Sequence, residues 1–332
     1  MFRETGGCAF WQFLCSHVGE NKMLSYTGKR LLQTIFVLLG ISLITFVLLQ
    51  VVPGDPVALM LEKRADPETI AKVRKELGLD LPYYVQYLNF IKGAIHLDFG
   101  TSYFTKEVVA DALIRCFKVT VKLACMSFIF ASVIGIPCGI FAAVKRGKGI
   151  DTVVMVLSIV GVSAPAFWVA IILQILFGLK LNVLPISGFD TPASYILPSL
   201  ALGARYAGNI ARITRTSMLE VLGQDYIRTA KAKGAMRWAV ILKHALKNAM
   251  IPIVTLVGTD FGYMLTGSML IEKVFSIPGI GKLAVDAMSN RDLPLLEGTV
   301  MYIAFVFVVV NLIVDVSYAF LDPRIRYGKG AA

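Results

Sequence analysis

Long uncharged apolar runs constrain the fold of this chain more than any other sequence feature. The run at 31–52 carries no charged residue, and a helix of that length crosses a hydrocarbon core of about 30 Å. Because lipid offers no partner to backbone polar groups, such runs are read as spanning helices. Further apolar runs lie near 123–144, 152–179, 195–218, 251–271 and 298–320. We therefore predict an all-α polytopic membrane protein with six transmembrane helices.

The composition agrees with a membrane location. Of the 332 residues, 56% are hydrophobic and 17% are charged, and the mean hydropathy is +0.70, outside the balance of soluble globular domains. The formal net charge is +11. The basic residues of the chain cluster beside the apolar runs. The bias of membrane proteins toward basic cytoplasmic segments explains this clustering better than nucleic-acid binding does. We expect lipid around the chain and no nucleic-acid partner.

The basic flanks set the predicted orientation. Lys29 and Arg30 precede the first run, a short basic loop at 145–148 separates the second and third, and the tail beyond residue 321 is basic. The N- and C-termini are therefore predicted to lie in the cytoplasm. Residues 1–22 are expected to be an N-terminal extension before a more credible start at Met23.

The chain divides into a first helix, an outer region and a core. Residues 23–52 are assigned to the first transmembrane helix, 53–115 to an extracytoplasmic helical region, and 116–332 to a core with five transmembrane helices. In the outer region, Asp66, Pro67 and Glu68 predict a helix start and Gly78 its end. A second outer helix is expected over 82–95.

Two features within the predicted spans concern helix packing and shape. Gly135 and Gly139 form a small-residue pattern that permits close helix approach. Pro165, in the middle of the third apolar run, predicts a kink within a single span.

A basic amphipathic segment lies between the fourth and fifth spans, within a predicted cytoplasmic loop at 219–250. Asp225 is expected to cap a short helix, and Gly234 to end or bend it. A second amphipathic helix is predicted from Trp238 to Ala245, with return to the membrane near Pro252.

Two charged residues fall inside predicted spans, Arg205 in the fourth and Asp260 in the fifth. Charges at membrane depth are costly, so each should pair with another group or face an aqueous path. An Arg205–Asp260 pair is one hypothesis, and an incidental structural role for Asp260 is the alternative.

No catalytic, cofactor-binding or metal site is predicted. The chain has no GxxxxGK[ST] phosphate loop, no HExxH and no GxSxG, and its five cysteines and three histidines lack metal-ligand spacing. Energy for transport would therefore have to come from a partner that docks on the cytoplasmic segment.

Several stretches together resemble one family in order and spacing. They are Pro53-Gly54-Asp55-Pro56, Phe99-Gly100-Thr101-Ser102, Thr229-Ala230-Lys231-Ala232-Lys233-Gly234, Glu272 with Val274-Phe275-Ser276-Ile277-Pro278-Gly279-Ile280-Gly281, Arg291-Asp292 and Asp322-Pro323-Arg324. In these stretches the chain resembles the inner-membrane permeases of ABC importers for oligopeptides, dipeptides and nickel.

The resemblance implies a role for the 219–250 segment as the EAA loop, whose first helix couples to an ATPase. The implied coupling residues are Asp225, Arg228, Thr229, Ala230, Lys231, Ala232, Lys233 and Gly234. Only Ala230, Gly234 and Leu246 match the general EAA pattern, a departure typical of the peptide and nickel branch.

The resemblance also implies partners and a location. The partners are a second homologous permease, two ATP-binding subunits and an extracytoplasmic substrate-binding protein. The chain would form half of a pathway for short peptides in the cytoplasmic membrane of a bacterium or archaeon. Import of nickel or a metal chelate is the alternative within this class. Outside it, a secondary transporter would need repeats with broken helices or relay charges, and a membrane enzyme would need a catalytic signature.

Overall fold

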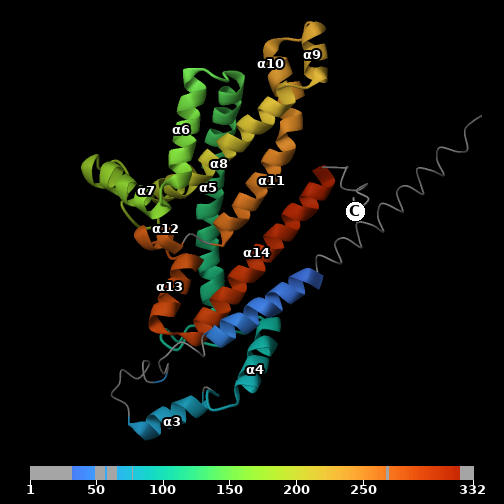
Figure 1. Ribbon diagram of the computed structural model, residues 1–332. Helices are drawn as coiled ribbons and strands as arrows, with labels where there is room; N and C mark the ends of the chain where they lie inside the picture. Colours follow the sequence, from blue (N-terminus) through green and yellow to red (C-terminus); the bar gives the residue numbers. More distant parts are fainter. Residues whose placement is uncertain (1–31, 49–56, 58–65, 77, 267–268, 322–332) are drawn as a thin grey trace, which may run out of the picture.

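Helices make up most of the computed structural model, which describes residues 32–48, 57, 66–76, 78–266 and 269–321 (Figure 1). Among these residues, strand pairing is limited to one isolated bridge between Thr101 and Val108. The helices are Leu32–Leu48, α3 Pro67–Glu76, α4 Tyr83–Ile95, α5 Val109–Val144, α6 Gly149–Ser163, α7 Ala166–Leu173, α8 Ile196–Leu222, α9 Asp225–Ala232, α10 Arg237–Ala239, α11 Leu246–Leu265, α12 Met269–Val274, α13 Ile280–Asn290 and α14 Leu293–Leu321. The all-α class is confirmed.

Three helices of the described chain are long and apolar enough to cross a membrane. They are α5, the continuous helix Arg237–Leu265, and α14 over Leu293–Ile313. A fourth span is present if the two bent segments Gly149–Ser163 and Ala166–Lys180 cross the membrane together. The first predicted span is described as a shorter apolar helix, Leu32–Leu48, and its remaining residues, with the stop at 53–56, lie outside the described ranges. A count of six stays a prediction.

Helices α5 and α8 pack closely because small residues lie where their backbones cross. A Cβ atom added at Gly135 would lie 2.8 Å from the Ala207 carbonyl oxygen, and one at Gly139 would lie 2.5 Å from that of Ala211. Real Cβ atoms do not approach backbone so closely, so both positions require glycine. The close helix approach expected from this pattern is confirmed, and it joins two helices of the same chain.

The third apolar run is broken rather than kinked. The segments Gly149–Ser163 and Ala166–Lys180 meet at 103°, which corrects the prediction of a single kinked span over 152–179. Ala164 adopts an extended conformation with ψ 131°, as proline disfavours the helical conformation in the residue before it. Pro165 then precedes the first turn of α7, where its missing N–H costs nothing.

The two ends of the molecule carry different elements, as Figure 1 shows. Helices α9 and α10 lie at the end where α5 and α6 are joined by the basic loop at 145–148. Helices α3, α4 and α13 lie at the opposite end, and α5 runs most of the distance between. Two of the segments predicted to be cytoplasmic, the loop at 145–148 and the segment of α9 and α10, therefore share one end; the two termini lie outside the described residues.

Helices α3 and α4 form where the sequence predicts them. Helix α3 begins at Pro67 with Glu68 in its first turn, and Gly78 follows it with φ +67°. Helix α4 begins directly after Pro82.

Candidate functional site

Helix α9 is a short helix with most of its side chains in solvent. It begins at Asp225, and Gln224 before it adopts the extended cap conformation without a side-chain cap hydrogen bond. The prediction that Asp225 caps the helix is therefore wrong. Its carboxylate lies in the first turn, where the helix dipole favours negative charge, 3.7 Å from the Arg228 guanidinium. Both side chains are almost fully exposed, so this pair adds little stability.

Two contacts attach α9 to the rest of the protein. The Ile227 side chain is fully buried, and half-buried Ala230 packs against the same apolar core. The Asn248 amide donates a 2.7 Å hydrogen bond to the Tyr226 hydroxyl. The other predicted coupling residues are exposed: Asp225, Arg228, Thr229, Lys231, Ala232, Lys233 and Gly234. Helix α9 is therefore attached to the protein through a small apolar contact, and its exposed face is mainly basic.

Gly234 ends α9 in the left-handed conformation, with φ +79°. The Gly234 N–H donates to the Lys231 carbonyl at 3.0 Å, and the Ala235 N–H donates to the Ala230 carbonyl at 3.2 Å. These two bonds form the Schellman arrangement, which satisfies carbonyls at a helix end and favours glycine. The prediction that Gly234 ends this helix is confirmed.

The helix after Gly234 does not stop before the membrane segment. Helix α10, a π-helical segment Val240–Ala245 and α11 form one continuous helix, Arg237–Leu265. The prediction of a separate amphipathic helix that re-enters near Pro252 is therefore wrong. Pro252 lies inside α11, since membrane helices tolerate proline where neighbouring groups and wider turns satisfy the backbone. The element beside α9 is thus the same helix that carries Asp260.

Asp260 lies in a cavity of about 450 Å³ between helices. The cavity is lined by Val162 from α6, Arg205, Tyr206 and Asn209 from α8, and Asp260 and Tyr263 from α11. Asp260 is 7% exposed, and the Asn209 amide donates to its Oδ2 at 3.5 Å. The Arg212 guanidinium in turn donates to Asn209 Oδ1 at 3.1 Å. The cavity is polar and holds one charge of each sign.

The hypothesised ion pair between Arg205 and Asp260 is not formed. Among the described residues, the salt bridges join Arg115 to Glu107, Arg215 to Asp151, and Arg228 to Asp225. The structure brings Arg205 and Asp260 together only as lining of the same cavity. The residues that complete that lining were not identified from the sequence: Val162, Tyr206, Asn209 and Tyr263.

A buried carboxylate on α12 was also missed as a structural centre. Glu272 is fully buried and accepts hydrogen bonds from Thr120 Oγ1 at 2.9 Å and the Lys282 N–H at 3.0 Å. Burial raises the pKa of the Glu272 carboxyl, and the hydrogen bonds from Lys282, Thr120 and Gly281 offset part of that rise. A charged residue within a run of apolar and glycine residues is the signal that could have identified it.

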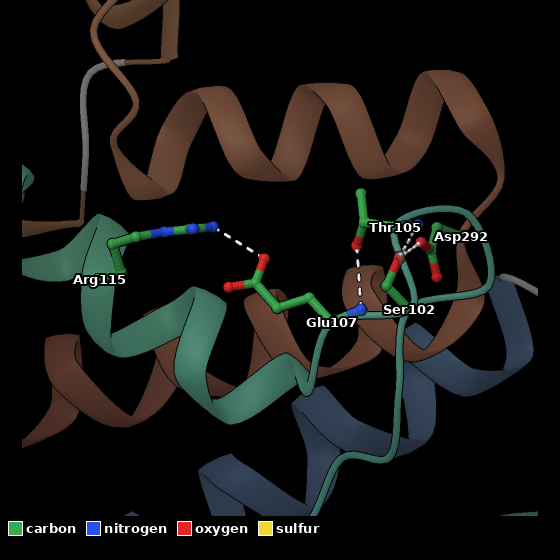
Figure 2. Close-up of polar contacts among 5 residues, drawn as sticks. All are labelled: Ser102, Thr105, Glu107, Arg115 and Asp292. Carbon is green, nitrogen blue, oxygen red and sulfur yellow. Dashed lines mark hydrogen bonds and ion pairs between the residues drawn. The ribbon is translucent and has the colours of Figure 1, made fainter.

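A second carboxylate fastens the outer loop before α5 (Figure 2). The Ser102 hydroxyl donates to Asp292 Oδ2 at 2.5 Å, and the Tyr103 N–H donates to Oδ1 at 3.1 Å. Burial, with smaller effects of Glu297 and Asp292, raises the pKa of Tyr103 to about 12. The motif residues Ser102 and Asp292 therefore join the loop to the start of α14.

An ion pair beside the basic loop at 145–148 links α6 to α8. The Arg215 guanidinium donates to both Asp151 oxygens, at 2.5 and 2.8 Å, and the Gly147 N–H donates to Oδ2 at 2.9 Å. This bidentate pair holds the basic loop at 145–148 against the helix that leads into α9.

Comparison with known proteins decides the family. Residues 135–327 match the family of the binding-protein-dependent transport system inner membrane component. Residues 23–124 match the N-terminal model of the same kind of membrane component. The chain belongs to this family.

Curated relatives match almost the whole chain. The glutathione transport system permease protein GsiC of Salmonella choleraesuis (strain SC-B67) is 44% identical over 305 residues, which are 92% of this chain and 100% of the relative. The protein of the same name from Escherichia coli (strain K12) is 43% identical over the same shares.

A solved structure supports the fold alone. The MetNI methionine ABC transporter, in an inward-facing conformation, matches with a TM-score of 0.54 at 18% identity. The match covers 63% of this chain and 96% of that chain.

These comparisons confirm the predicted family, an ABC importer inner-membrane permease of the dipeptide and oligopeptide type. The protein is a membrane transport subunit rather than an enzyme. Membership of this family implies ATP-binding and substrate-binding partners.

Proposed function

We propose that this chain forms half of the translocation pathway of an ATP-driven importer for short peptides. One relationship carries the proposal: exposed, basic α9 packs against the helix Arg237–Leu265, which continues unbroken to the cavity at Asp260. A rigid connection of this kind can transmit movement from a docked ATPase to the pathway.

The proposed complex contains a second homologous permease, two ATP-binding subunits and an extracytoplasmic substrate-binding protein. This chain contributes six spans, with both termini in the cytoplasm of a bacterium or archaeon. The shared position of α9 and the basic loop at 145–148 supports this orientation, since basic segments remain on the cytoplasmic side.

We assign coupling to the exposed face of α9. Arg228, Lys231 and Lys233 supply positive charge, and Ile227 with Tyr226 keeps the helix in place. In this role, α9 enters a groove of the ATP-binding subunit, and Gly234 ends the inserted part.

Short peptides are the substrate class best supported. The named relatives are glutathione permeases, and glutathione is a short peptide. The cavity between α6, α8 and α11 offers both a cationic and an anionic side chain, as recognition of a molecule with two charged ends requires.

Photo-cross-linking in native membranes tests the coupling assignment. A photoreactive phenylalanine derivative at position 231, on exposed α9, should form an adduct with an ATP-binding protein that co-purifies with the chain. The same derivative at position 92, on exposed α4 at the other end, should not. Failure of any ATP-binding protein to co-purify, or equal cross-linking from position 92, would contradict the proposal.

A further inference from the structure

The cavity between α6, α8 and α11 has the dimensions of a small-molecule site. Its volume is about 450 Å³, within the range of about 300–1,000 Å³ common for ligand pockets. An extended dipeptide spans roughly 7 Å between its ends, which a cavity of this volume accommodates.

Its two charged side chains are available to a ligand. The Asp260 side chain is 7% exposed and accepts a hydrogen bond from the Asn209 amide at the long distance of 3.5 Å. Arg205 is exposed to the cavity and forms no ion pair with Asp260 or another described carboxylate. Charges within a membrane protein interior are costly unless a partner compensates them.

The chemistry of the lining selects a ligand with one charge of each sign. A guanidinium binds a carboxylate with two parallel hydrogen bonds, which suits Arg205 to a peptide carboxyl end. A carboxylate accepts hydrogen bonds from an ammonium group, which suits Asp260 to a peptide amino end. The rings of Tyr206 and Tyr263 and the side chain of Val162 add apolar surface for peptide side chains.

We infer that this cavity is a subsite for zwitterionic short peptides, with Arg205 binding the carboxylate and Asp260 binding the ammonium group. Asn209 positions the Asp260 carboxylate and is itself held by Arg212. The inference rests on the proposed import function and specifies how the permease recognises its substrate. Because Asp260 lies on the helix that begins beside α9, an occupied cavity and the coupling helix are linked through one rigid element.

Direct binding to the complete permease–ATPase complex, without the substrate-binding protein, tests this subsite. Radiolabelled dialanine is measured by equilibrium dialysis, with N-acetyl-dialanine, dialanine amide and alanine as competitors. The unmodified complex should bind dialanine at least about tenfold more tightly than N-acetyl-dialanine or dialanine amide, since a charge-assisted hydrogen bond is lost with either blocked end. Alanine tests whether a single amino acid, which carries the same two charges, is the true ligand.

Variants assign the two ends of the ligand to the two side chains. Asp260→Asn should weaken dialanine binding about 10- to 100-fold and abolish discrimination against N-acetyl-dialanine, and Arg205→Gln should do the same for dialanine amide. One matched control is Asp286→Asn, at a half-buried position of α13. The other is Arg115→Gln, because the Arg115 guanidinium binds Glu107 outside the cavity. Neither control should change binding.

Several outcomes would overturn the subsite. They are absence of saturable dialanine binding, equal binding of blocked and unblocked peptides, alanine binding as tightly as dialanine, or unchanged discrimination in both variants. ATP-driven uptake of dialanine by the unmodified complex separates the two claims. If uptake is present without discrimination at the cavity, the subsite alone is wrong; if uptake is absent, the proposed function is wrong.

Discussion

Thr120 on α5 donates a 2.9 Å hydrogen bond from its hydroxyl to Glu272 Oε1. The same hydroxyl accepts a 2.9 Å hydrogen bond from the Ile280 N–H, at the start of α13. Thr120 and Glu272 are 152 positions apart, and both are buried. One side chain therefore fixes α12 and α13 to the long helix α5.

Removal of the Thr120 hydroxyl should destabilise this outer assembly. Thr120→Val leaves the Ile280 N–H and Glu272 Oε1 without this partner, which should cost about 1–3 kcal/mol of unfolding free energy. Thermal unfolding of the purified complex measures the change. Thr120→Ser keeps the hydroxyl and is the matched control, so equal melting temperatures for the valine and serine variants would contradict the account.

The stability contributed by Glu272 should depend on pH. Burial raises the folded-state pKa of this carboxyl, so the stability it contributes is fully present below its unfolded-state pKa of about 4.3. That stability is lost as pH rises through the folded-state pKa. Glu272→Gln cannot ionise, so the melting temperature of the unmodified protein, relative to this variant, should fall as pH rises above the unfolded-state pKa.

Glu76→Gln, at an exposed position of α3, is the control for Glu272→Gln and should follow the pH dependence of the unmodified protein. The contradicting result concerns the melting temperature of the unmodified protein minus that of Glu272→Gln. If this difference stayed constant or increased as pH rises, the ionised carboxylate would not be disfavoured by the fold.

A methyl group at Gly139 should separate α5 from α8. The added Cβ would lie 2.5 Å from both the Ala211 carbonyl oxygen and Thr214 Cβ, so the helices must shift, at a cost of about 1–3 kcal/mol. Gly139→Ala should therefore lower the melting temperature of the complex. Gly149→Ala has no atom within 4 Å of the added Cβ and should have little effect. Equal effects of the two substitutions would argue against the tight helix crossing.

Gly234 offers a test of coupling that does not depend on steric clash. No atom lies within 4 Å of an added Cβ, and φ is +79°, so a side chain meets backbone strain alone, about 1–2 kcal/mol. Gly234→Val should leave ATP hydrolysis but reduce peptide uptake per ATP, because the end of α9 shifts. Gly234→Asn, which tolerates this conformation better, should retain coupling. Equal uptake per ATP in the valine and asparagine variants would count against a strained joint at this position.

Local sequence signals predicted the ends of the short helices well. Pro67 and Gly78 bound α3, and Gly234 ends α9, because proline at a helix start and glycine at its end act through their own backbone preferences. The same signals failed for Asp225, where acidity in the first turn was taken for a cap.

Three of the four prolines in the apolar runs show where local signals are insufficient; the fourth, Pro198, lies in the first turn of α8. Pro137 lies inside α5 and Pro252 inside α11, whereas Pro165 separates two segments at 103°. Each removes one N–H donor, and whether the helix continues depends on neighbouring helices that satisfy the freed carbonyl. The sequence alone does not show which helices pack beside each proline.

Only two of the six residues that line the cavity were predictable, for a similar reason. Arg205 and Asp260 are conspicuous as charges in apolar runs, but Asn209 and Tyr263 join them because of the way α8 crosses α11. The Thr120–Glu272 contact likewise depends on packing between distant segments.

Uptake of radiolabelled dialanine into proteoliposomes tests the central claim most directly. The vesicles contain this chain, its partner permease and the ATP-binding subunits, and the substrate-binding protein is added on the outside. We predict accumulation of dialanine that requires both enclosed ATP and the binding protein. Accumulation without ATP, or none under any of these conditions, would contradict the assignment of this chain to an ATP-driven peptide importer.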